Sequence, residues 1–272
     1  MCGIVGILGH QDVASALVDA LKRLEYRGYD SAGIATLHHG QLDRRRAEGK
    51  LRNLENKLLE FPLHGATGIG HTRWATHGRP VERNAHPHAT GKVAVVHNGI
   101  IENFRELREE LQATGVVFES DTDTEVVAQL LTRMLDTLND PVKAVEQVLP
   151  RLRGAFALGI LFAGEDDLLI GARQGAPLAI GYGDGEMYLG SDALALAPFT
   201  SQITYLDDGD WVVMTRKGAE IFDASNRSVK RAKVHSAAGA YSVDKGNHRH
   251  FMMKEIHEQP EVVGRTLSHY LD

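Results

Sequence analysis

The chain has 272 residues, of which 43% are hydrophobic and 24% are charged, as is ordinary for a soluble globular protein. This composition excludes disorder, collagen and coiled coil, and the length allows one large domain or two small ones. The net charge of -6 makes the chain a poor candidate for binding nucleic acid or an anionic membrane. The basic run 44–46 is interpreted as part of a solvated strand or turn, because Glu48 follows it.

A single cysteine excludes an intrachain disulfide and favours a reducing compartment. No apolar run approaches the ~20 residues that a membrane span needs, and the first residues lack the pattern of a signal peptide. We therefore expect a cytoplasmic protein.

Hydrophobic periodicity predicts the elements in chain order. Residues 3–8 are a short apolar run typical of a buried strand. Residues 13–24, with Asp12 as the expected N-cap, place their apolar side chains on one helical face. Residues 25–33 are predicted as a loop because glycine and polar residues dominate. The next elements are a hairpin over 34–47 turning at Gly40, a helix over 51–59, and strands over 68–74 and 93–101.

The second half of the chain begins with helices and continues with strands. Helices are predicted over 103–113, 123–138 and 141–152, and Thr122 with Glu125 forms a capping-box pattern. Short strands separated by Gly- and Asp-rich turns are predicted over 155–162, 168–172, 178–182, 186–189, 203–206, 210–215 and 219–222. Because strands and helices do not alternate strictly, we expect an α+β domain with mostly antiparallel pairing.

Cys2 is the only cysteine and follows the initiator methionine. Removal of Met1 would leave a thiol and a free α-amine on one residue, with ordinary pKa values near ~8.5 and ~7.7–8.0. These two groups form a nucleophile and its own general base. The alternative is a small buried residue without a chemical role; a position at the start of a terminal strand favours the nucleophile.

The polar cluster 71–78 directly follows an apolar strand. Arg73 at the strand end can hold a carboxylate with two parallel hydrogen bonds, which lysine cannot do, and Trp74 can cover a site. An ordinary surface loop with an ion-paired arginine explains the same pattern equally well.

Two further segments have both a structural and a chemical interpretation. Asn98-Gly99 between apolar runs is a strong hairpin-turn signal, although an asparagine amide and a glycine N–H also suit an oxyanion hole. The acidic segment 119–125 is typical of a helix N-terminus, although one carboxylate can bind an ammonium group. In both segments the pattern alone favours the structural interpretation.

No metal or cofactor is expected. The alternating histidine pairs at 86/88 and 248/250 lack the spacing of a zinc site, and no phosphate-binding loop motif occurs.

Taken together, six segments resemble the class II glutamine amidotransferases, in particular those whose glutaminase domain is joined to a sugar-isomerase domain. The segments are 2–6, 23–33, 71–78, 84–88, 96–103 and 120–125. The resemblance covers essentially the whole chain, since residues 253–260 look like the linker into the isomerase domain. It implies the N-terminal-nucleophile (Ntn) hydrolase fold, a four-layer αββα sandwich of mostly antiparallel sheets.

The resemblance also implies a reaction and roles for individual residues. L-Glutamine would be hydrolysed to glutamate and ammonia through a thioester on Cys2, whose α-amine moves the proton. The implied site residues are Asn98 and Gly99 as the oxyanion hole, Arg73 for the α-carboxylate, Asp123 for the α-amino group, Thr76 and His77 in the pocket loop, Trp74 as a gate for ammonia, and His86 and Arg27 nearby.

The resemblance implies a glutaminase domain over 1–240 and a linker or tail over 241–272. The partner of that tail would be a sugar-isomerase domain that this chain lacks, which would bind fructose 6-phosphate and use the ammonia. The full-length enzyme is a possible homo-oligomer, and the chain alone is expected only to hydrolyse glutamine.

Overall fold

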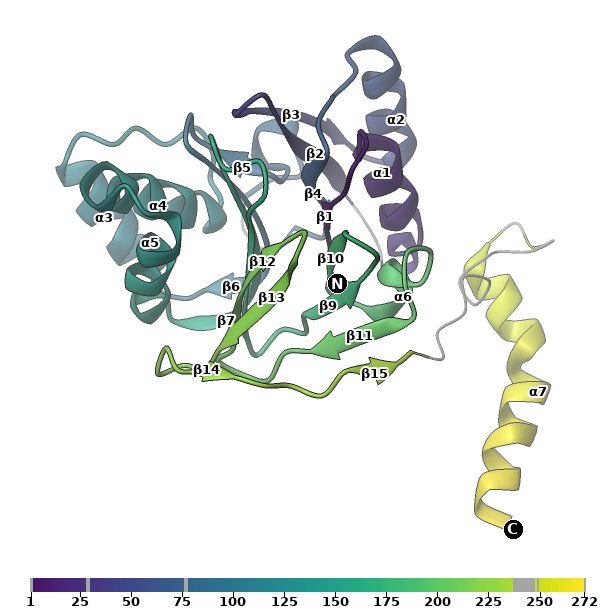
Figure 1. Ribbon diagram of the computed structural model, residues 1–272. Coiled ribbons are helices and arrows are strands. Elements are labelled where there is room, and N and C mark those ends of the chain that lie inside the picture. The colour runs from purple at the N-terminus through teal and green to yellow at the C-terminus, as the bar shows by residue number, and fades with distance from the viewer. Residues whose placement is uncertain (1, 28–29, 76–77, 237–247, 249, 272) are drawn as a thin grey trace.

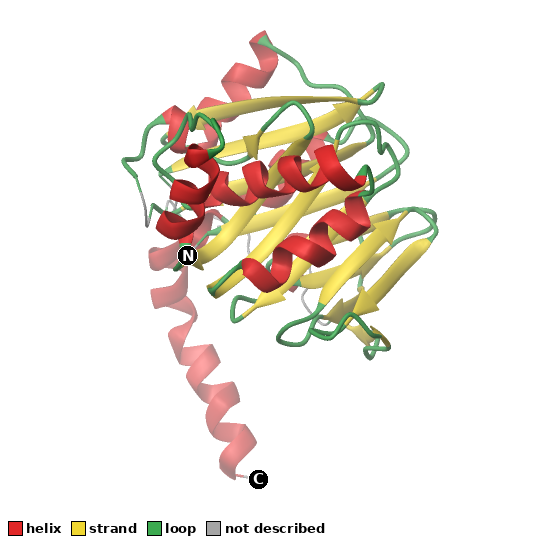
Figure 2. Cartoon of the chain, turned by 90° about the vertical axis from the view of Figure 1, so that its left-hand side faces the viewer, coloured by secondary structure: helices red, strands yellow, loops and turns green. Residues whose placement is uncertain are grey.

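The computed structural model describes residues 2–27, 30–75, 78–236, 248 and 250–271. Two antiparallel sheets, of eight and seven strands, lie face to face, with helices on both outer surfaces (Figure 1). Figure 2 shows the helices of one outer layer crossing in front of the strands. This is the predicted α+β fold, with the four layers in the order helix, sheet, sheet, helix.

The eight-stranded sheet begins and ends with edge strands far apart in the chain. In spatial order it contains β15 (Val234–His235), β11 (Gln202–Tyr205), β9 (Ala179–Tyr182), β10 (Met187–Gly190), β1 (Gly3–Leu8), β4 (Thr67–Arg73), β2 (Ser31–His38) and β3 (Gln41–Glu48). Its outer face carries α1 (Ala14–Lys22), α2 (Leu51–Glu60) and the short α6 (Ala193–Leu196), with the 3₁₀ turn η1 (Glu25–Arg27) following α1.

The seven-stranded sheet is built from the middle of the chain. In spatial order it contains β14 (Ser228–Val229), β13 (Gly218–Phe222), β12 (Trp211–Thr215), β8 (Leu169–Gln174), β7 (Gly154–Phe162), β6 (Val93–Ile101) and β5 (His88–Ala89). Helices α3 (Phe104–Ala113), α4 (Thr124–Leu138) and α5 (Pro141–Val148) cover its outer face, and the 3₁₀ turns η2 (Glu82–Asn84) and η3 (Leu149–Arg151) complete the elements.

Alternation along β6 assigns its side chains to two different cores. Val93 and Val95 are buried against the helices, whereas Ala94 and Val96 are buried between the sheets. Because the period of a strand is two, Asn98 continues the row that faces the other sheet. The alternation of side chains along β6 therefore directs the Asn98 amide into the space between the sheets.

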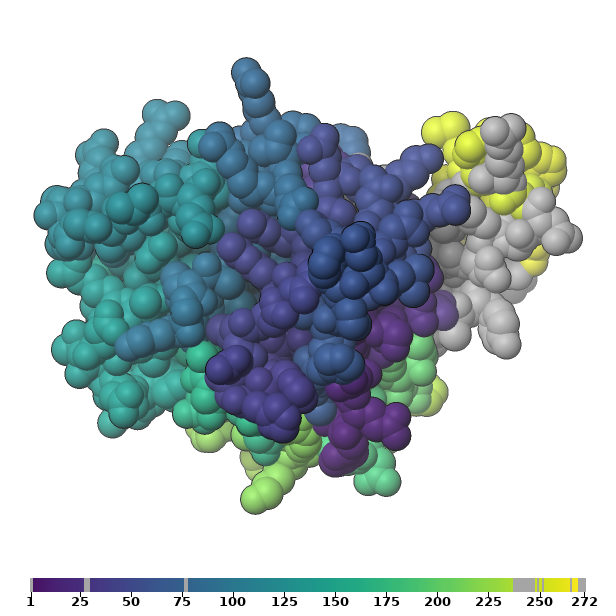
Figure 3. All heavy atoms as spheres, turned by 90° about the horizontal axis from the view of Figure 1, so that it is seen from above, coloured from purple at the N-terminus to yellow at the C-terminus, as the bar shows by residue number. Residues whose placement is uncertain are grey.

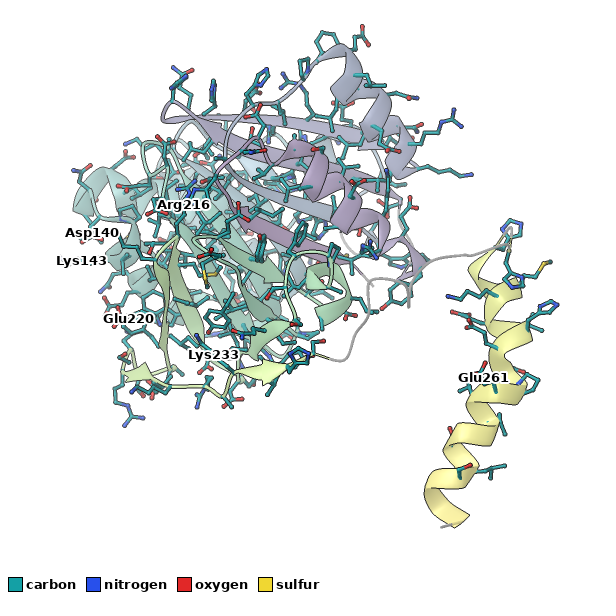
Figure 4. The ribbon with its side chains drawn as sticks, turned by 45° about the vertical axis from the view of Figure 1, so that its right-hand side comes forward. Asp140, Lys143, Arg216, Glu220, Lys233 and Glu261 are labelled. Carbon is teal, nitrogen blue, oxygen red and sulfur yellow. The ribbon has the colours of Figure 1, made fainter. Side chains whose placement is uncertain are left out.

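Two predicted helix caps are wrong because the expected capping side chains bind other backbone N–H groups. The α1 N-cap is Val13, and Asp12 accepts instead from the backbone N–H of Gly65 at 2.8 Å. Glu125 binds the N–H groups of residues 119 and 120 rather than that of Thr122. In contrast, α5 begins as expected with Pro141, and Asp140, labelled in Figure 4, accepts from the N–H of Lys143 at 3.1 Å.

The loop predicted over 25–33 ends earlier, since β2 begins at Ser31. The arginines of β3 are not simply solvated. Arg44 donates to the carbonyl of Pro87 at 3.3 Å, and Arg46 donates to that of Ala85 at 3.0 Å. These two side chains hold the segment that carries His86 against the edge of the eight-stranded sheet.

Arg216, labelled in Figure 4, ties the two sheets together at the end of β1 that lies away from Cys2. Its Nε donates to the Gly9 carbonyl at 2.6 Å, and its Nη2 donates to Thr67 Oγ1 at 2.9 Å. It also pairs with Asp167 at 3.0 Å. One guanidinium from the β12–β13 turn therefore joins β1, β4 and the segment before β8.

The last helix, α7 (Phe251–Leu271), is longer than the predicted 255–271 and projects away from the sandwich (Figure 1). Viewed from above, it lies to one side of the body (Figure 3). Several of its apolar side chains are exposed, among them Met252, Ile256, Val263 and Leu267. None of the described helices combines the length and apolarity needed to cross a membrane.

Candidate active site

Cys2 lies where the start of β1 meets the end of β4. The register pairs Gly3 with Thr72, which brings Cys2 next to Arg73 and Trp74. The backbone N–H of Trp74 donates to Cys2 Sγ at 3.1 Å, and the carbonyl of Trp74 lies 3.4 Å from the same sulfur. The only cysteine of the chain is therefore held by main-chain groups of the residue that follows β4.

Burial raises the pKa of the Cys2 thiol above its ordinary value. The N–H of Trp74 and the positive charge of Arg73 act in the opposite direction without reversing the shift. The thiol is therefore protonated at neutral pH, and a nucleophilic Cys2 needs a base close by.

Asn98 reaches from the seven-stranded sheet to Cys2. Its Nδ2 donates to the Cys2 carbonyl at 3.2 Å, while its Oδ1 lies 3.0 Å from Nε2 of the buried His71. The side-chain amide thus joins β6 to both β1 and β4.

Gly99 continues the strand rather than turning it. Its φ is +119°, and a Cβ at this position would lie 2.0 Å from the Ala155 carbonyl oxygen. β6 pairs with β7 from Val93 to Ile101, so the hairpin-turn interpretation of Asn98-Gly99 is wrong. Only glycine fits here, because its positive φ and the close approach of β7 both exclude a side chain.

Arg73 is 3% exposed and is held by its own loop. Its Nη1 donates to the carbonyl of Arg79 at 3.3 Å, and its Nη2 donates to that of Gly78 at 3.2 Å. Asp30 Oδ1 lies 3.7 Å from Nη1 and provides the countercharge. Asp30 also accepts from the N–H of Ala75, so one carboxylate holds both the arginine and the chain after it.

Asp123 lies at the N-cap of α4 and is 3% exposed. Its side chain makes no capping hydrogen bond; Oδ2 accepts instead from the N–H of Ile101 at 2.8 Å. His97 Nδ1 is 3.8 Å from the same oxygen. The acidic helix start is therefore directed at the end of β6, close behind Gly99 in the chain.

A group of buried histidines lies behind Asn98. The ring centroids of His71 and His86 are 4.2 Å apart, and those of His86 and His88 are 4.8 Å apart. His86 Nε2 and His97 Nδ1 both contact Thr124 Oγ1, at 2.8 and 2.9 Å. Within the part of the chain that the structure describes, no three His, Cys, Asp or Glu side chains are placed to hold a metal ion.

Burial lowers the pKa of His71 to about 3 and holds the pKa values of His86 and His88 well below their ordinary value. The positive charge of Arg73 acts in the same direction on all three rings, and Arg44 and Arg46 add to it at His88. These three imidazoles are therefore neutral in the folded protein at physiological pH.

For the remaining predicted site residues, the structure shows no side-chain contact with Cys2 within the described part of the chain. The side chain of Trp74 is outward and 55% exposed, so only its main chain contacts Cys2. Arg27 ends η1, and its side chain lies outside the described part of the structure. Thr76 and His77 lie outside the described residues altogether.

Three contacts around the site were not predicted from the sequence. The first two are the Asp30–Arg73 ion pair and the His71–Asn98 hydrogen bond. The third anchors β1: Ser191 Oγ accepts a hydrogen bond from the N–H of Ile4 at 3.0 Å. Asp30 and His71 belong to the segments that carry the family resemblance, which was the only available signal for them. Ser191 lies 187 positions from Ile4, and no local pattern reports such a contact.

Comparisons with known proteins found similar sequences and a similar fold. A family model of the glutamine amidotransferase domain matches residues 71–198. The chain is 68% identical over all 272 residues to glutamine–fructose-6-phosphate aminotransferase (isomerizing) of Bradyrhizobium diazoefficiens, and 66% identical to that of Brucella suis. It covers 45% of each, so it spans about half the length of these relatives.

A solved structure shows the same fold. Glutamine phosphoribosylpyrophosphate amidotransferase from B. subtilis aligns with 84% of this chain and 50% of its own, with a TM-score of 0.72 and 26% identity. The sequence matches and the shared fold agree with one another. Residues 71–198 of this chain are a glutamine amidotransferase domain, and the whole chain is similar to the amidotransferases named above.

Proposed function

We propose that this chain hydrolyses L-glutamine to L-glutamate and ammonia, with Cys2 as the nucleophile after removal of Met1. One observation carries the proposal: the amide of Asn98 crosses from the other sheet to donate to the main chain of Cys2, whose sulfur lies beside Arg73. A nucleophile and a hydrogen-bond donor for developing negative charge thereby meet at one residue.

The chemistry follows from the state of the thiol. Because burial keeps Cys2 protonated, its α-amine, with an ordinary pKa of about 7.7–8.0, takes the proton as sulfur attacks the side-chain carbonyl carbon of glutamine. The tetrahedral oxyanion receives hydrogen bonds from Asn98 Nδ2 and the Gly99 N–H. Collapse breaks the C–N bond, and the ammonium form of the amine gives its proton to the departing ammonia. Water, deprotonated by the same amine, then hydrolyses the thioester to glutamate and the free thiol.

The proposed substrate contacts use the charges around this centre. Arg73 binds the α-carboxylate and Asp123 binds the α-ammonium group, each buried and of opposite sign to its ligand. Thr76 and His77 line the pocket, and Trp74 covers the path along which ammonia leaves. His86 and Arg27 are further residues of this proposed site.

The relatives are named for a second substrate, fructose 6-phosphate, and the chain covers 45% of their length. We propose that the ammonia passes to that sugar on an isomerase domain outside this chain. Residues 1–240 form the glutaminase domain and residues 241–272 lead towards that partner. A cysteine that must stay reduced suits a cytoplasmic location.

The test is glutamate release from L-glutamine by a sample whose intact mass shows that Met1 is absent. The wild-type chain should release glutamate, while Cys2→Ala should release none yet still gain thermal stability from glutamine by mass action. Arg73→Lys should raise KM about tenfold or more, since lysine keeps the charge without the planar fork.

Two outcomes would overturn the proposal. Undiminished release by Cys2→Ala would exclude the nucleophile. Stabilisation by glutamine without any glutamate from processed wild-type chain would identify a binding module rather than an enzyme.

A further inference from the structure

His71 lies behind Asn98 on the strand that ends at Arg73. The two positions 71 and 73 are two residues apart on β4, so both side chains face the seven-stranded sheet. His71 is fully buried, and its Nε2 is 3.0 Å from Asn98 Oδ1. The ring is therefore a bridge between the sheets and has no direct contact with solvent.

The hydrogen bonds fix which way the Asn98 amide points. An amide nitrogen and oxygen are distinguished by their partners, and the Cys2 carbonyl, 3.2 Å away, only accepts. The group facing Cys2 is therefore Nδ2, and the group facing His71 is Oδ1. Turning the amide over would set two oxygens against each other at Cys2.

The same constraint fixes the proton of His71. Oδ1 only accepts, so the bond requires a proton on Nε2. Burial keeps the imidazole neutral by lowering its pKa to about 3, so it carries one proton. The Nε2–H tautomer is the one that satisfies Asn98.

Neighbouring rings hold His71 in place. His86 packs on it with a centroid distance of 4.2 Å and is itself fixed by Thr124 Oγ1 at 2.8 Å. The same hydroxyl contacts His97 on β6 at 2.9 Å. Both sheets and the start of α4 thus restrain the orientation of the donor.

We propose that His71 is a positioning residue for glutamine hydrolysis, whose Nε2–H fixes the Asn98 amide with Nδ2 towards the oxyanion. The inference rests on the proposed function. Without this hydrogen bond, only the Cys2 carbonyl restrains the amide among the residues that the structure describes. An amide that rotates then turns its oxygen towards the developing negative charge. His71 acts only through Asn98 and touches neither sulfur nor substrate.

Kinetics of two substitutions test the proposal. His71→Leu should lower kcat about 10- to 100-fold, less than the ~10²–10³-fold typical of removing an oxyanion donor outright, and should leave KM within about threefold. His71→Gln places an N–H near the position of Nε2 and should keep kcat within about fivefold. His88→Leu is the matched control, because it also removes a buried imidazole, 2% exposed, but one that bonds Thr122; its kcat should stay within twofold.

A double-mutant cycle separates positioning from general damage. If His71 acts through Asn98, His71→Leu should cause no further loss of kcat in an Asn98→Ala background. A multiplicative loss in the double variant, or equal losses for His71→Leu and His71→Gln, would overturn the proposal. So would unchanged kcat in His71→Leu while Asn98→Ala is impaired.

A measurement without turnover keeps the two proposals distinguishable. Long-range ¹H–¹⁵N spectra of the wild-type chain should show His71 protonated at Nε2 and should change in Asn98→Ala. A proton on Nδ1 refutes the positioning contact whether or not the chain is active. Absence of glutamate release by processed wild type refutes the proposed function independently of that spectrum.

Discussion

Mild acid is expected to destabilise this domain strongly, because folding buries three neutral imidazoles. The folded-state pKa of His71 is about 3, and those of His86 and His88 lie well below the ordinary value of 6.5. For a base whose pKa is lowered by folding, the stabilisation is present above the unfolded pKa and is lost as the pH falls below it. The affected window therefore lies below about pH 7.

The magnitude follows from proton uptake. Between pH 7.5 and 5.5 an unfolded histidine with a pKa of about 6.5 gains most of a proton, while each buried ring gains almost none. Each ring then costs about 1.4 kcal/mol of unfolding free energy over this interval, and three cost about 4 kcal/mol. Carboxylates with lowered pKa values, such as Asp223, titrate below this window. They therefore do not alter the difference in unfolding free energy between pH 7.5 and 5.5.

Urea unfolding at several pH values, followed by tryptophan fluorescence, measures this dependence. Below pH 6 the slope of unfolding free energy against pH should correspond to about three protons. His88→Leu should reduce it to about two, even if that variant is less stable at every pH. A stability that is flat between pH 7.5 and 5.5, or a slope unchanged in His88→Leu, would refute the argument from buried neutral rings.

Three further substitutions probe the site and the frame that holds it. Gly99→Ala should lower the unfolding free energy measured in urea by about 3 kcal/mol or more, because a Cβ at this position combines a positive φ with a clash against the backbone. Gly91→Ala is the control: nothing lies within 4 Å of a Cβ there, so the unfolding free energy should change by less than about 1 kcal/mol. Asp30→Ala should raise KM for glutamine about tenfold in steady-state assays, because Arg73 and the chain after it lose the carboxylate that holds them in place, and an unchanged KM would contradict this. Arg216→Ala should cost about 2–3 kcal/mol by thermal unfolding and leave kcat unchanged, since it lies at the opposite end from Cys2.

Local periodicity predicted most of the strands and helices, and its errors have a common cause. Asp12 and Thr122 have the sequence features of helix caps, yet Gly65 and His88 bind them from other parts of the fold. The hairpin signal at 98–99 failed because β7 pairs with the whole of β6. In each of these three places a partner far away in the sequence determines the structure, and a short stretch of sequence carries no information about such a partner. The two-residue strands β5, β14 and β15 are too short to show any period.

The candidate site was predictable only in part for the same reason. Cys2 stands out by chemistry alone, as the single thiol at a terminus. Its proximity to Arg73 and Asn98 depends on two strand registers and on the packing of one sheet against the other. The family resemblance supplied those neighbours, and the geometry then showed how Asp30 and His71 support them.

The buried histidines and the Cys2 amine predict two separable effects of acid. His71 remains neutral in the folded state down to a pH of about 3, so the hydrogen bond to Asn98 survives throughout the range in which the domain is folded. The ordinary pKa of an α-amine is about 7.7–8.0, so with the Cys2 amine as the base kcat should already fall below pH 8 while the fold is intact. Warming should accelerate unfolding at pH 6. The midpoint of the pH profile of kcat should move with temperature only as far as the pKa of an amine does. A kcat midpoint that instead tracks the unfolding midpoint, shifting in parallel in His88→Leu, would show that acid acts on the fold and that no amine near neutrality serves as the base.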